Sequence, residues 1–507
     1  MRRIAAAVVF AFGVVTGLEA APEDAVTQAD LKVLLDRLSK LEAENKAQAA
    51  RIAELEASGK VVAKKLEAAE MKATEESKKF ELQTQKLSQM AQASFAQAEG
   101  TTTNETGRIF TTAQGFKYYL ADASARIFEP LSESGLKITP YGYLVFEGVY
   151  NTHGTESDYY SDWVKSPHSS AYGDHTSTLS MQDSILGMKF ETPEAHKGWK
   201  FIGLAEMDLA GGDANDYVFH WRHLYFDAQH ESGWSILFGQ TWHLWKMVTP
   251  SDIDGAWLEQ TGHPYRRSPQ LRVTKQWNWE DSSLNVRVGI LKNGPGMGGD
   301  RDSNGTQDNS ASAWPLFEAA VVYDRDAPWQ DENDLADKRW LVGVGGMYGQ
   351  DRSHNFRADG SFGDNEDYDS SLGMLAGKIP FWDFTLNGQI FAGQNLGGVQ
   401  AGIGQGVGYD EYGRGRAVRT IGGFLDLAYQ LNADWSFAVG YGFDNPNDTD
   451  ARYAEGRLFN DRAYIDAFYQ VTDNFKLGIQ YARLSTKWFD EGTGYSDRVQ
   501  FSAFYDF

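Results

Sequence analysis

The last residues of the chain alternate between apolar and polar side chains, and this pattern constrains the fold more than any other. Val499, Phe501, Ala503, Tyr505 and Phe507 occupy every second position, with Gln500, Ser502 and Asp506 among the residues between them. Period-two alternation places the two sets on opposite faces of a strand. A strand that ends on an aromatic residue in this way is typical of the closing strand of an outer-membrane β-barrel. We therefore expect one face to meet lipid and the other a wetter lumen.

The other end of the chain predicts export. Arg2 and Arg3 precede an apolar run over residues 4–15, and small residues follow. We interpret residues 1–20 as a signal peptide, cleaved after Gly17 or Ala20; the alternative is a buried N-terminal helix. No later stretch of about 18 apolar residues occurs, so no transmembrane helix is expected. An exported chain without such a helix can span a membrane only as a closed barrel.

Composition excludes several functions. The absence of cysteine removes disulfides, thiolate metal sites, c-type haem attachment and cysteine nucleophiles. The net charge of −23 falls almost entirely after residue 100. A nucleic-acid partner is not expected, because phosphate contact requires a basic face. No Ser-His-Asp set or HExxH pair stands out, so we do not expect an enzyme.

A heptad pattern extends over residues 31–90 and predicts a coiled coil, which we place at 27–92. The alternative is a single charged helix that never pairs. Polar seam residues often fix register and strand number. We expect the pattern to assemble a homotrimer, and the candidate oligomerisation residues are Leu31, Leu34, Leu38, Leu41, Asn45, Gln48, Ile52, Leu55 and Leu66. Residues 93–135 are interpreted as a linker.

Residues 136–507 contain about 16 short alternating segments, separated by connections that are alternately short and long. The fold class predicted is thus an all-β transmembrane barrel of about 16 antiparallel strands, preceded by an N-terminal α-helical coiled coil. An even count places both barrel ends, and the coiled coil, in the periplasm, where the coil tip could meet the cell wall. The expected long outer loops include 151–179, 244–268, 293–314, 349–369 and 394–419. The expected strands are 137–150, 180–191, 199–208, 217–229, 234–243, 269–278, 284–292, 315–324, 339–348, 370–379, 383–393, 420–430, 435–444, 461–470, 475–486 and 495–507.

Alternation within these strands assigns charged side chains to the lumen. A lipid-facing charge at mid-depth costs about 2–4 kcal/mol, so charged positions belong inside. Arg222, Arg272 and Arg287 come from neighbouring strands and predict a basic ladder, which would favour anionic solutes. The alternative is that Glu206 and Asp208 neutralise them. The full set of candidate pore-lining residues is Glu206, Asp208, Arg222, Gln240, Arg266, Arg267, Arg272 and Arg287.

Two of the long loops differ in their predicted position. Loop 244–268 follows the fifth strand, where general porins fold a loop inward, so we expect an inward constriction; the alternative is an exposed loop. The glycines at 402, 404, 406 and 408 lack the Lys-Ser/Thr of a phosphate-binding loop, and we interpret this tract as a flexible outer loop.

One acidic loop matches part of a calcium-binding pattern. Asp300, Asp302, Asn304, Gly305 and Asp308 have the spacing of the first nine positions of a calcium loop. The bidentate acid expected at the twelfth position is replaced by Ala311. We predict either a weak calcium site in an outer loop or a plain solvated acidic loop, and no other cofactor.

Three local segments support a family resemblance. They are Trp221-Arg222-His223-Leu224-Tyr225, Phe238-Gly239-Gln240-Thr241-Trp242 and Arg267-Ser268-Pro269-Gln270-Leu271-Arg272. With the order of signal, coiled coil and about 16 strands, the chain resembles the DcaP-like trimeric porins. The resemblance implies a homotrimer in the outer membrane, and described members of that family favour dicarboxylates.

These observations leave two functions open. The first is an outer-membrane porin, in which small hydrophilic solutes, with anions such as dicarboxylates preferred, diffuse passively. The second is a structural tether or adhesin, in which the coiled coil carries the function and the barrel is only an anchor. Ion conductance after reconstitution separates them.

Overall fold

A computed structural model describes residues 136–507, except 193–195, 213–216, 293–313, 332 and 357–361. The signal peptide, the coiled coil with its oligomerisation residues, the linker and the calcium pattern at 300–308 therefore lie outside the described residues. Within the described part, no helix has the length and apolar character needed to cross a membrane. The elements in that part are nearly all β-strands, which agrees with the predicted all-β barrel.

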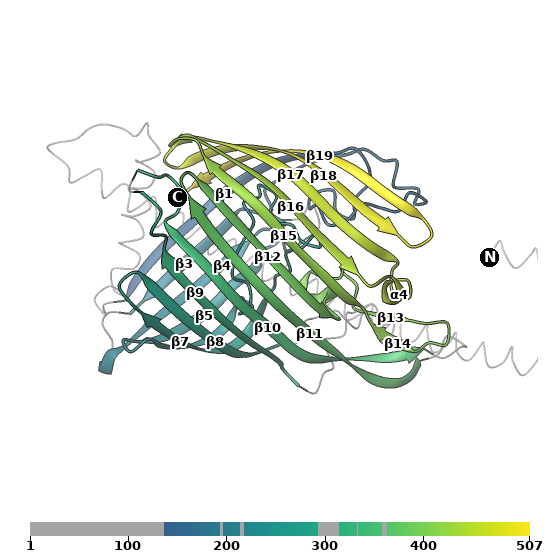
Figure 1. The fold of residues 1–507 in the computed structure, drawn as a ribbon, viewed down its shortest axis with the longest axis horizontal. Coiled ribbons are helices and arrows are strands. Elements are labelled where there is room, and N and C mark those ends of the chain that lie inside the picture. The colour runs from purple at the N-terminus through teal and green to yellow at the C-terminus, as the bar shows by residue number, and fades with distance from the viewer. Residues whose placement is uncertain (1–135, 193–195, 213–216, 293–313, 332, 357–361) are drawn as a thin grey trace, which may run out of the picture. The chain divides into compact units, whose positions relative to one another are not determined.

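The strands form one closed antiparallel sheet (Figure 1). Each strand pairs with the next along the chain, and the last returns to the first, from Tyr143↔Asp506 to Asn151↔Arg498. The bounds are β1 (Lys137–Asn151), β2 (Thr176–Ser180), β3 (Ile185–Glu191), β4 (Trp199–Asp208), β5 (His220–His230), β6 (Trp234–Trp242), β7 (Arg267–Asn278), β8 (Ser282–Leu291), β9 (Leu316–Asp326), β10 (Arg339–Phe356), β11 (Phe362–Phe381), β12 (Phe384–Gln394), β15 (Arg419–Gln430), β16 (Trp435–Pro446), β17 (Arg457–Thr472), β18 (Phe475–Trp488) and β19 (Gly492–Asp506).

The barrel has 16 strand positions, as the sequence predicts. The short strands β2 and β3 both pair with β1, β2 with its C-terminal half and β3 with its N-terminal half, so together they fill one position. Closure matters because a closed sheet has no edge, so every backbone group inside a bilayer finds a partner.

Side chains alternate between the two faces of the wall. In β19, Val499 and Phe501 are exposed on the outer surface, whereas Arg498, Gln500 and Ser502 are buried inside. Aromatic residues also gather at the rim formed by the short turns: the Phe384 and Tyr429 rings stack 4.5 Å apart, and Trp435 lies 4.8 Å from Tyr469. An apolar outer band with an aromatic rim fits a membrane-embedded wall.

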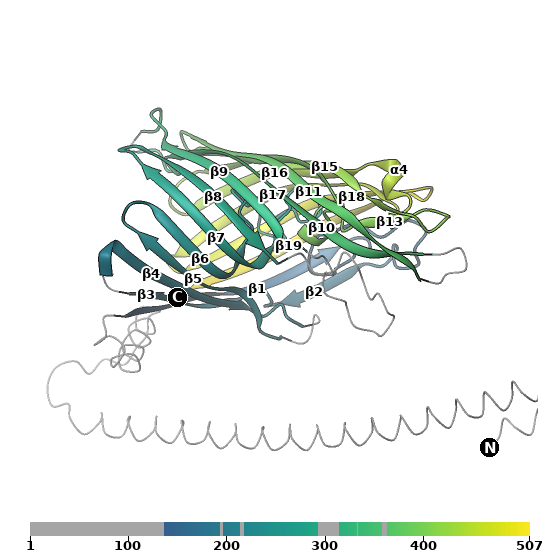
Figure 2. The same ribbon diagram turned by 90° about the horizontal axis from the view of Figure 1, so that it is seen from below.

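The two ends of the barrel differ. The C-terminus lies at the end with the short turns, while the helix α4 (Asp448–Ala451) and the hairpin of β13 (Val407–Tyr409) and β14 (Gly415–Ala417) lie at the end with the long loops (Figures 1 and 2). The predicted alternation of short and long connections is therefore confirmed.

One predicted long loop, 349–369, is wrong. The strands β10 and β11 continue through most of it and stay in register from Leu341↔Lys378 to His354↔Asn365. Cross-strand polar pairs stabilise the extension: Arg352 Nε lies 2.7 Å from Asp367 Oδ1, and Tyr348 donates to Asp369 at 3.0 Å. Beyond the membrane both faces of a strand meet water, so the apolar alternation that identifies a strand disappears.

The long connection 394–419 lies between β12 and β15 as predicted, but its glycine tract is not a flexible outer loop. The connection contains β13, β14 and the short helix η2 (Gly397–Val399). Leu396, Val399, Ala401 and Ile403 are all buried. Glycine composition alone predicts flexibility, whereas the buried apolar residues between the glycines hold the segment in a fixed structure.

Candidate functional site

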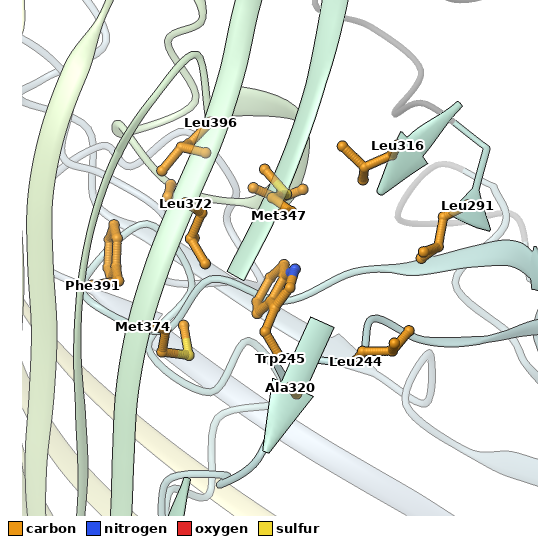
Figure 3. Packing of buried hydrophobic residues seen from close by; sticks show 12 residues of the cluster. Leu244, Trp245, Leu291, Leu316, Ala320, Met347, Leu372, Met374, Phe391 and Leu396 are labelled. Carbon is orange, nitrogen blue, oxygen red and sulfur yellow. The ribbon is translucent and has the colours of Figure 1, made fainter. Parts of the chain in front are cut away.

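The connection between β6 and β7, residues 243–266, enters the barrel as expected. At its base, the Leu244 amide and the Trp245 indole each donate to the Glu318 carboxylate at 2.8 Å. Both side chains are fully buried against the wall formed by β8 to β12 (Figure 3). The apolar residues packed around them include Leu291, Leu316, Ala320, Met347, Leu372, Met374, Phe391 and Leu396. Apolar burial therefore fixes where the loop leaves the wall.

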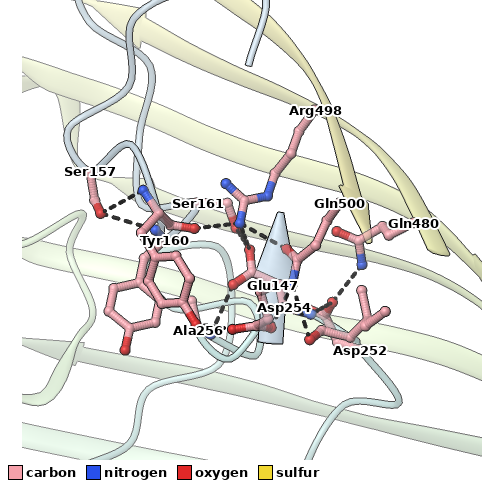
Figure 4. A network of polar contacts seen from close by, with 12 residues as sticks. Glu147, Ser157, Tyr160, Ser161, Asp252, Asp254, Ala256, Gln480, Arg498 and Gln500 are labelled. Atoms are coloured by element: carbon pink, nitrogen blue, oxygen red, sulfur yellow. Dashed lines mark hydrogen bonds and ion pairs between the residues drawn. The ribbon is translucent and has the colours of Figure 1, made fainter. Parts of the chain in front are cut away.

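The tip of this loop is fixed to the opposite wall by charge. Arg462 of β17 binds both oxygens of Asp252, at 3.0 and 3.1 Å, and lies 3.3 Å from Asp254. Arg498 of β19 lies 3.5 Å from Asp254, beside Gln500 and Glu147 (Figure 4). Burial alone would raise the pKa of Asp254, but Arg498 and Arg462 outweigh it and hold that pKa below its usual range. The loop thus crosses the lumen and is attached at both ends.

The loop divides the lumen into cavities. A central cavity of about 660 Å³ extends from Asp383 and Lys476, near the short turns, to Arg267. An outer cavity of about 390 Å³ lies between the loop and the residues 397–404. Both cavities are lined by His220, Tyr265, Arg267 and Gln400. Because they share these four residues, the two cavities are adjacent, and Tyr265 of the loop lies between them.

The structure places Arg222 on the wall of the central cavity, together with Asp208. Arg222 is neutralised there: its Nε donates to Glu206 at 2.9 Å and its Nη1 to Asp208 at 2.9 Å. Glu206 also accepts from the Tyr141 hydroxyl at 2.7 Å. For this arginine the alternative interpretation holds, in which the charges pair with one another along the wall.

Arg272 and Arg287 differ from Arg222. Arg272 donates to the Gln270 side chain at 3.0 Å and to the Trp242 carbonyl at 2.5 Å, and Arg287 donates to Asn285 at 2.7 Å. These acceptors are neutral. The register Arg272↔Gly289 and Thr274↔Arg287 makes the two arginines diagonal neighbours on β7 and β8. They form a basic pair, while Arg222 lies across β6 from it, so a continuous three-arginine ladder is not formed.

Gln240, Arg266 and Arg267 line the outer cavity. Gln240 donates to the Trp221 carbonyl at 2.6 Å, and Arg266 donates to the Gly398 carbonyl. The Arg267 guanidinium lies over the Trp242 ring, with Cζ 4.4 Å from the ring centroid. Gln240 and Arg267 come from two of the three segments that carry the family resemblance, and Arg266 directly precedes the third.

Sequence reasoning missed the second inward loop, residues 395–404. Gly402 N donates to Asp444 at 2.7 Å, and the Gln400 side chain accepts from Gln260 of the first loop at 2.7 Å. Arg457 of β17 donates to the Ile403 carbonyl at 2.8 Å. The alternation of glycine with the apolar residues Val399, Ala401 and Ile403 was the signal that could have identified it.

Three acidic residues that line the central cavity, and Lys246 of the first loop, have shifted pKa values. Burial raises the pKa of Asp183 to about 6, that of Asp162 to about 7 and that of Glu259 to about 8. Burial, together with the neighbouring Arg267 and Arg222, lowers the pKa of Lys246 to about 7. Charge in the central cavity therefore changes near neutral pH. Over the described ranges, no group of three or more His, Cys, Asp or Glu residues could hold a metal ion.

Comparison with solved structures identifies the fold. The chain is similar to the outer membrane channel DcaP of Acinetobacter baumannii, with a TM-score of 0.58 and 19% identity over 73% of this chain and 97% of that one. An anion-selective porin from Comamonas acidovorans matches with a TM-score of 0.47 and 12% identity over 73% and 100% of the two chains. No family model and no curated protein matches the sequence. The DcaP-like resemblance inferred from the sequence is thus confirmed as a shared fold.

Proposed function

We propose that the protein is an outer-membrane porin through which small hydrophilic solutes diffuse passively, with a preference for anions such as dicarboxylates. The observation that carries the proposal is a closed barrel with a loop that crosses the lumen between two adjacent cavities, which share four lining residues. A barrel that served only as an anchor would not need a polar passage on both sides of a fixed loop.

The preference for anions is supported by Arg272 and Arg287 of the inner wall, which donate to neutral acceptors, and by Arg266 and Arg267, which line the outer cavity with no carboxylate among its described lining residues. The net charge of −23 does not contradict it. The screening length at 0.1 M salt is about 10 Å, so charges on distant outer loops act weakly on an ion in the narrow passage. Wall charges act at closer range. Among the acidic residues that line the central cavity, Asp208 and Asp252 are paired with arginines, and burial raises the pKa of Asp162 to about 7 and that of Glu259 to about 8, which reduces the negative charge that an anion meets there.

Reversal potentials in a KCl gradient across a planar bilayer test this function. Replacing Arg272 and Arg287 by Gln should shift the reversal potential toward cations. Arg222→Gln should shift it further, because it uncovers both Glu206 and Asp208. The matched control is Arg483→Gln, an exposed arginine paired with Asp497 on the outer surface, which should leave the potential unchanged.

The outcomes separate the alternatives. A wild-type channel that already prefers cations strongly would remove the anion preference and leave a general porin. The absence of any channel current would favour the tether or adhesin, in which the coiled coil carries the function. The homotrimer, the periplasmic coiled coil at 27–92, its contact with the cell wall and the weak calcium site at 300–308 stay predictions.

A further inference from the structure

The lining of the outer cavity is unusual for so acidic a chain. Among the described residues that line it, Arg266 and Arg267 carry charge and none is a carboxylate. The central cavity, by contrast, is lined by eight acidic residues and three basic ones. A space lined by two guanidinium groups and no carboxylate favours an anion, because the nearest charges act most strongly on it.

Arg267 is the group in this cavity that can hold an anion. Its guanidinium lies against the Trp242 ring, which leaves the N–H edge directed away from the ring. No described residue accepts a hydrogen bond from its buried Nη1 nitrogen. Buried donors in native proteins nearly always have a partner, and an unpaired one requires an explanation. A carboxylate is the partner that a guanidinium edge fits best.

The opposite side of the cavity is built and fixed. Arg266 donates to the Gly398 carbonyl, Gln260 donates to the Gln400 side chain, and Asp444 accepts from the Gly402 amide. Ile403 is fully buried at a φ of +54°, a conformation that a β-branched residue adopts only when its surroundings hold it there. The second loop is therefore a rigid wall.

We propose that the outer cavity is a capture site for one small carboxylate, with Arg267 as its ligand and Arg266 as the residue that positions the loop opposite. The inference rests on the proposed porin function and adds a binding step to it. Trp242 and Tyr265 offer apolar surface to the carbon chain of the ligand, and glycines 397, 398 and 404 let it approach the backbone closely. A volume of about 390 Å³ suits one small organic acid.

Capture has a measurable consequence. A solute that binds in the passage occupies it, so chloride current through the full-length channel falls as succinate is added and then levels off. Succinamide, the uncharged diamide of the same length, should not reduce the current, because the site recognises charge. In Arg267→Gln, the succinate concentration for half-maximal reduction should rise at least about tenfold.

A matched control is available in the connection between β12 and β15, which also contains the second loop. Arg414 is exposed and pairs with Asp410 in the β13–β14 hairpin, outside the cavity. Arg414→Gln should bind succinate like the wild type. Arg267→Lys keeps the charge but loses the planar fork, and it should give an intermediate value. Arg266→Gln tests positioning: it should weaken succinate binding and also make the open-channel current noisier, because the loop loses one attachment.

The results that would overturn the capture site differ from those that would overturn the porin. A conducting channel that succinate does not affect, or that succinate reduces equally in wild type and Arg267→Gln, removes the capture site and leaves the porin. If Arg267→Gln does not fold, calorimetric titration of succinate into the purified wild type and into Gln400→Ala tests the capture site instead. The absence of succinate binding in the wild type overturns the proposal. Only the absence of current removes the porin itself.

Discussion

The outer and central cavities are adjacent parts of one passage, yet their charges are opposite in kind. The outer cavity has two arginines and no carboxylate among its described lining residues. The central cavity is lined by eight acidic residues against Arg222, Arg267 and Lys476. The contrast shows that neither the net charge of a chain nor the composition of one cavity predicts the field that a solute meets at another. It also separates two tasks: the outer cavity is suited to binding an anion and the central one to releasing it.

One loop maintains this contrast, and its two ends are attached by different forces. The base at Leu244 and Trp245 is held by extensive apolar burial together with hydrogen bonds to Glu318, whereas the tip at Asp252 and Asp254 is held by the buried Arg462 and Arg498. Apolar packing depends little on pH or on a single partner. A buried ion pair depends strongly on both, because removal of one member leaves the other charge without compensation. The tip is therefore the place where the two cavities can be merged.

The largest expected effect comes from Arg462→Met, which merges the cavities. Asp252 would remain buried without its guanidinium and Asp254 would keep only Arg498, at a cost of about 3–5 kcal/mol to the attachment of the loop tip. The tip should detach, giving larger and noisier single-channel currents and a lower denaturation midpoint. Single-channel recordings and guanidinium titration of the refolded barrel measure both.

Two companions sharpen this prediction. Adding Asp252→Asn to Arg462→Met should reduce the current noise part of the way to the wild-type level, because it removes one uncompensated charge. Arg483→Met breaks only an exposed pair, worth about 0–1 kcal/mol, and should behave like the wild type. Equal currents from Arg462→Met and Arg483→Met would mean that the loop is held by its apolar base alone.

The next effect concerns pH and the central cavity. Asp183, Asp162 and Glu259 have pKa values raised by burial to about 6, 7 and 8, so they are neutral at lower pH and gain negative charge in that order. Lys246, whose pKa burial lowers to about 7, is charged at lower pH and loses its charge as pH rises. Both changes make the local charge more negative as pH rises. The preference for chloride should be greatest near pH 5.5 and fall as pH rises through 6–8.

Reversal potentials measured at several pH values test this. Glu259→Gln should remove the step nearest pH 8, whereas Asp410→Asn, on an exposed hairpin, should keep the full profile. A wild-type profile that is flat between pH 5.5 and 9 would show that these carboxyl groups do not face the conducting path. Succinate binding in the outer cavity should change less over this range, because Arg266 and Arg267 stay charged throughout.

The wall of the barrel could be predicted from sequence because the membrane enforces it. All 16 predicted strands occur, and β4 has the predicted bounds 199–208. Apolar residues at every second position leave no other arrangement in lipid, which explains why Val499 and Phe501 face outward as expected. The exceptions are the extensions of β10 and β11, where water on both faces removes the pattern.

The lumen could be predicted only in part. Alternation assigns Arg222, Arg272 and Arg287 to the inside, but it does not give the partner of each charge. Arg222 meets two carboxylates because the strand order places Glu206 and Asp208 of β4 beside it. The attachment of Asp252 to Arg462 joins residues 210 positions apart in sequence, and the second loop depends on contacts of the same kind. Such contacts follow from the closed barrel and have no local signal.

The smallest expected effect tests how tightly the first loop fits where the cavities meet. A methyl group added at Gly255 would meet the carboxylate of Asp183, whereas one added at Gly262 would meet the backbone carbonyl of Gly423. Gly262 also has a φ of +112°, which disfavours any other residue. The Asp183 side chain can change its rotamer, whereas the backbone of Gly423 in β15 cannot move. We therefore expect Gly255→Ala to lower the single-channel conductance by less than about twofold. Gly262→Ala should displace the loop and disturb the current more. If the order were reversed, Asp183 would be fixed more rigidly than the wall, and its hydrogen bond from the Tyr160 hydroxyl at 2.8 Å would be the reason.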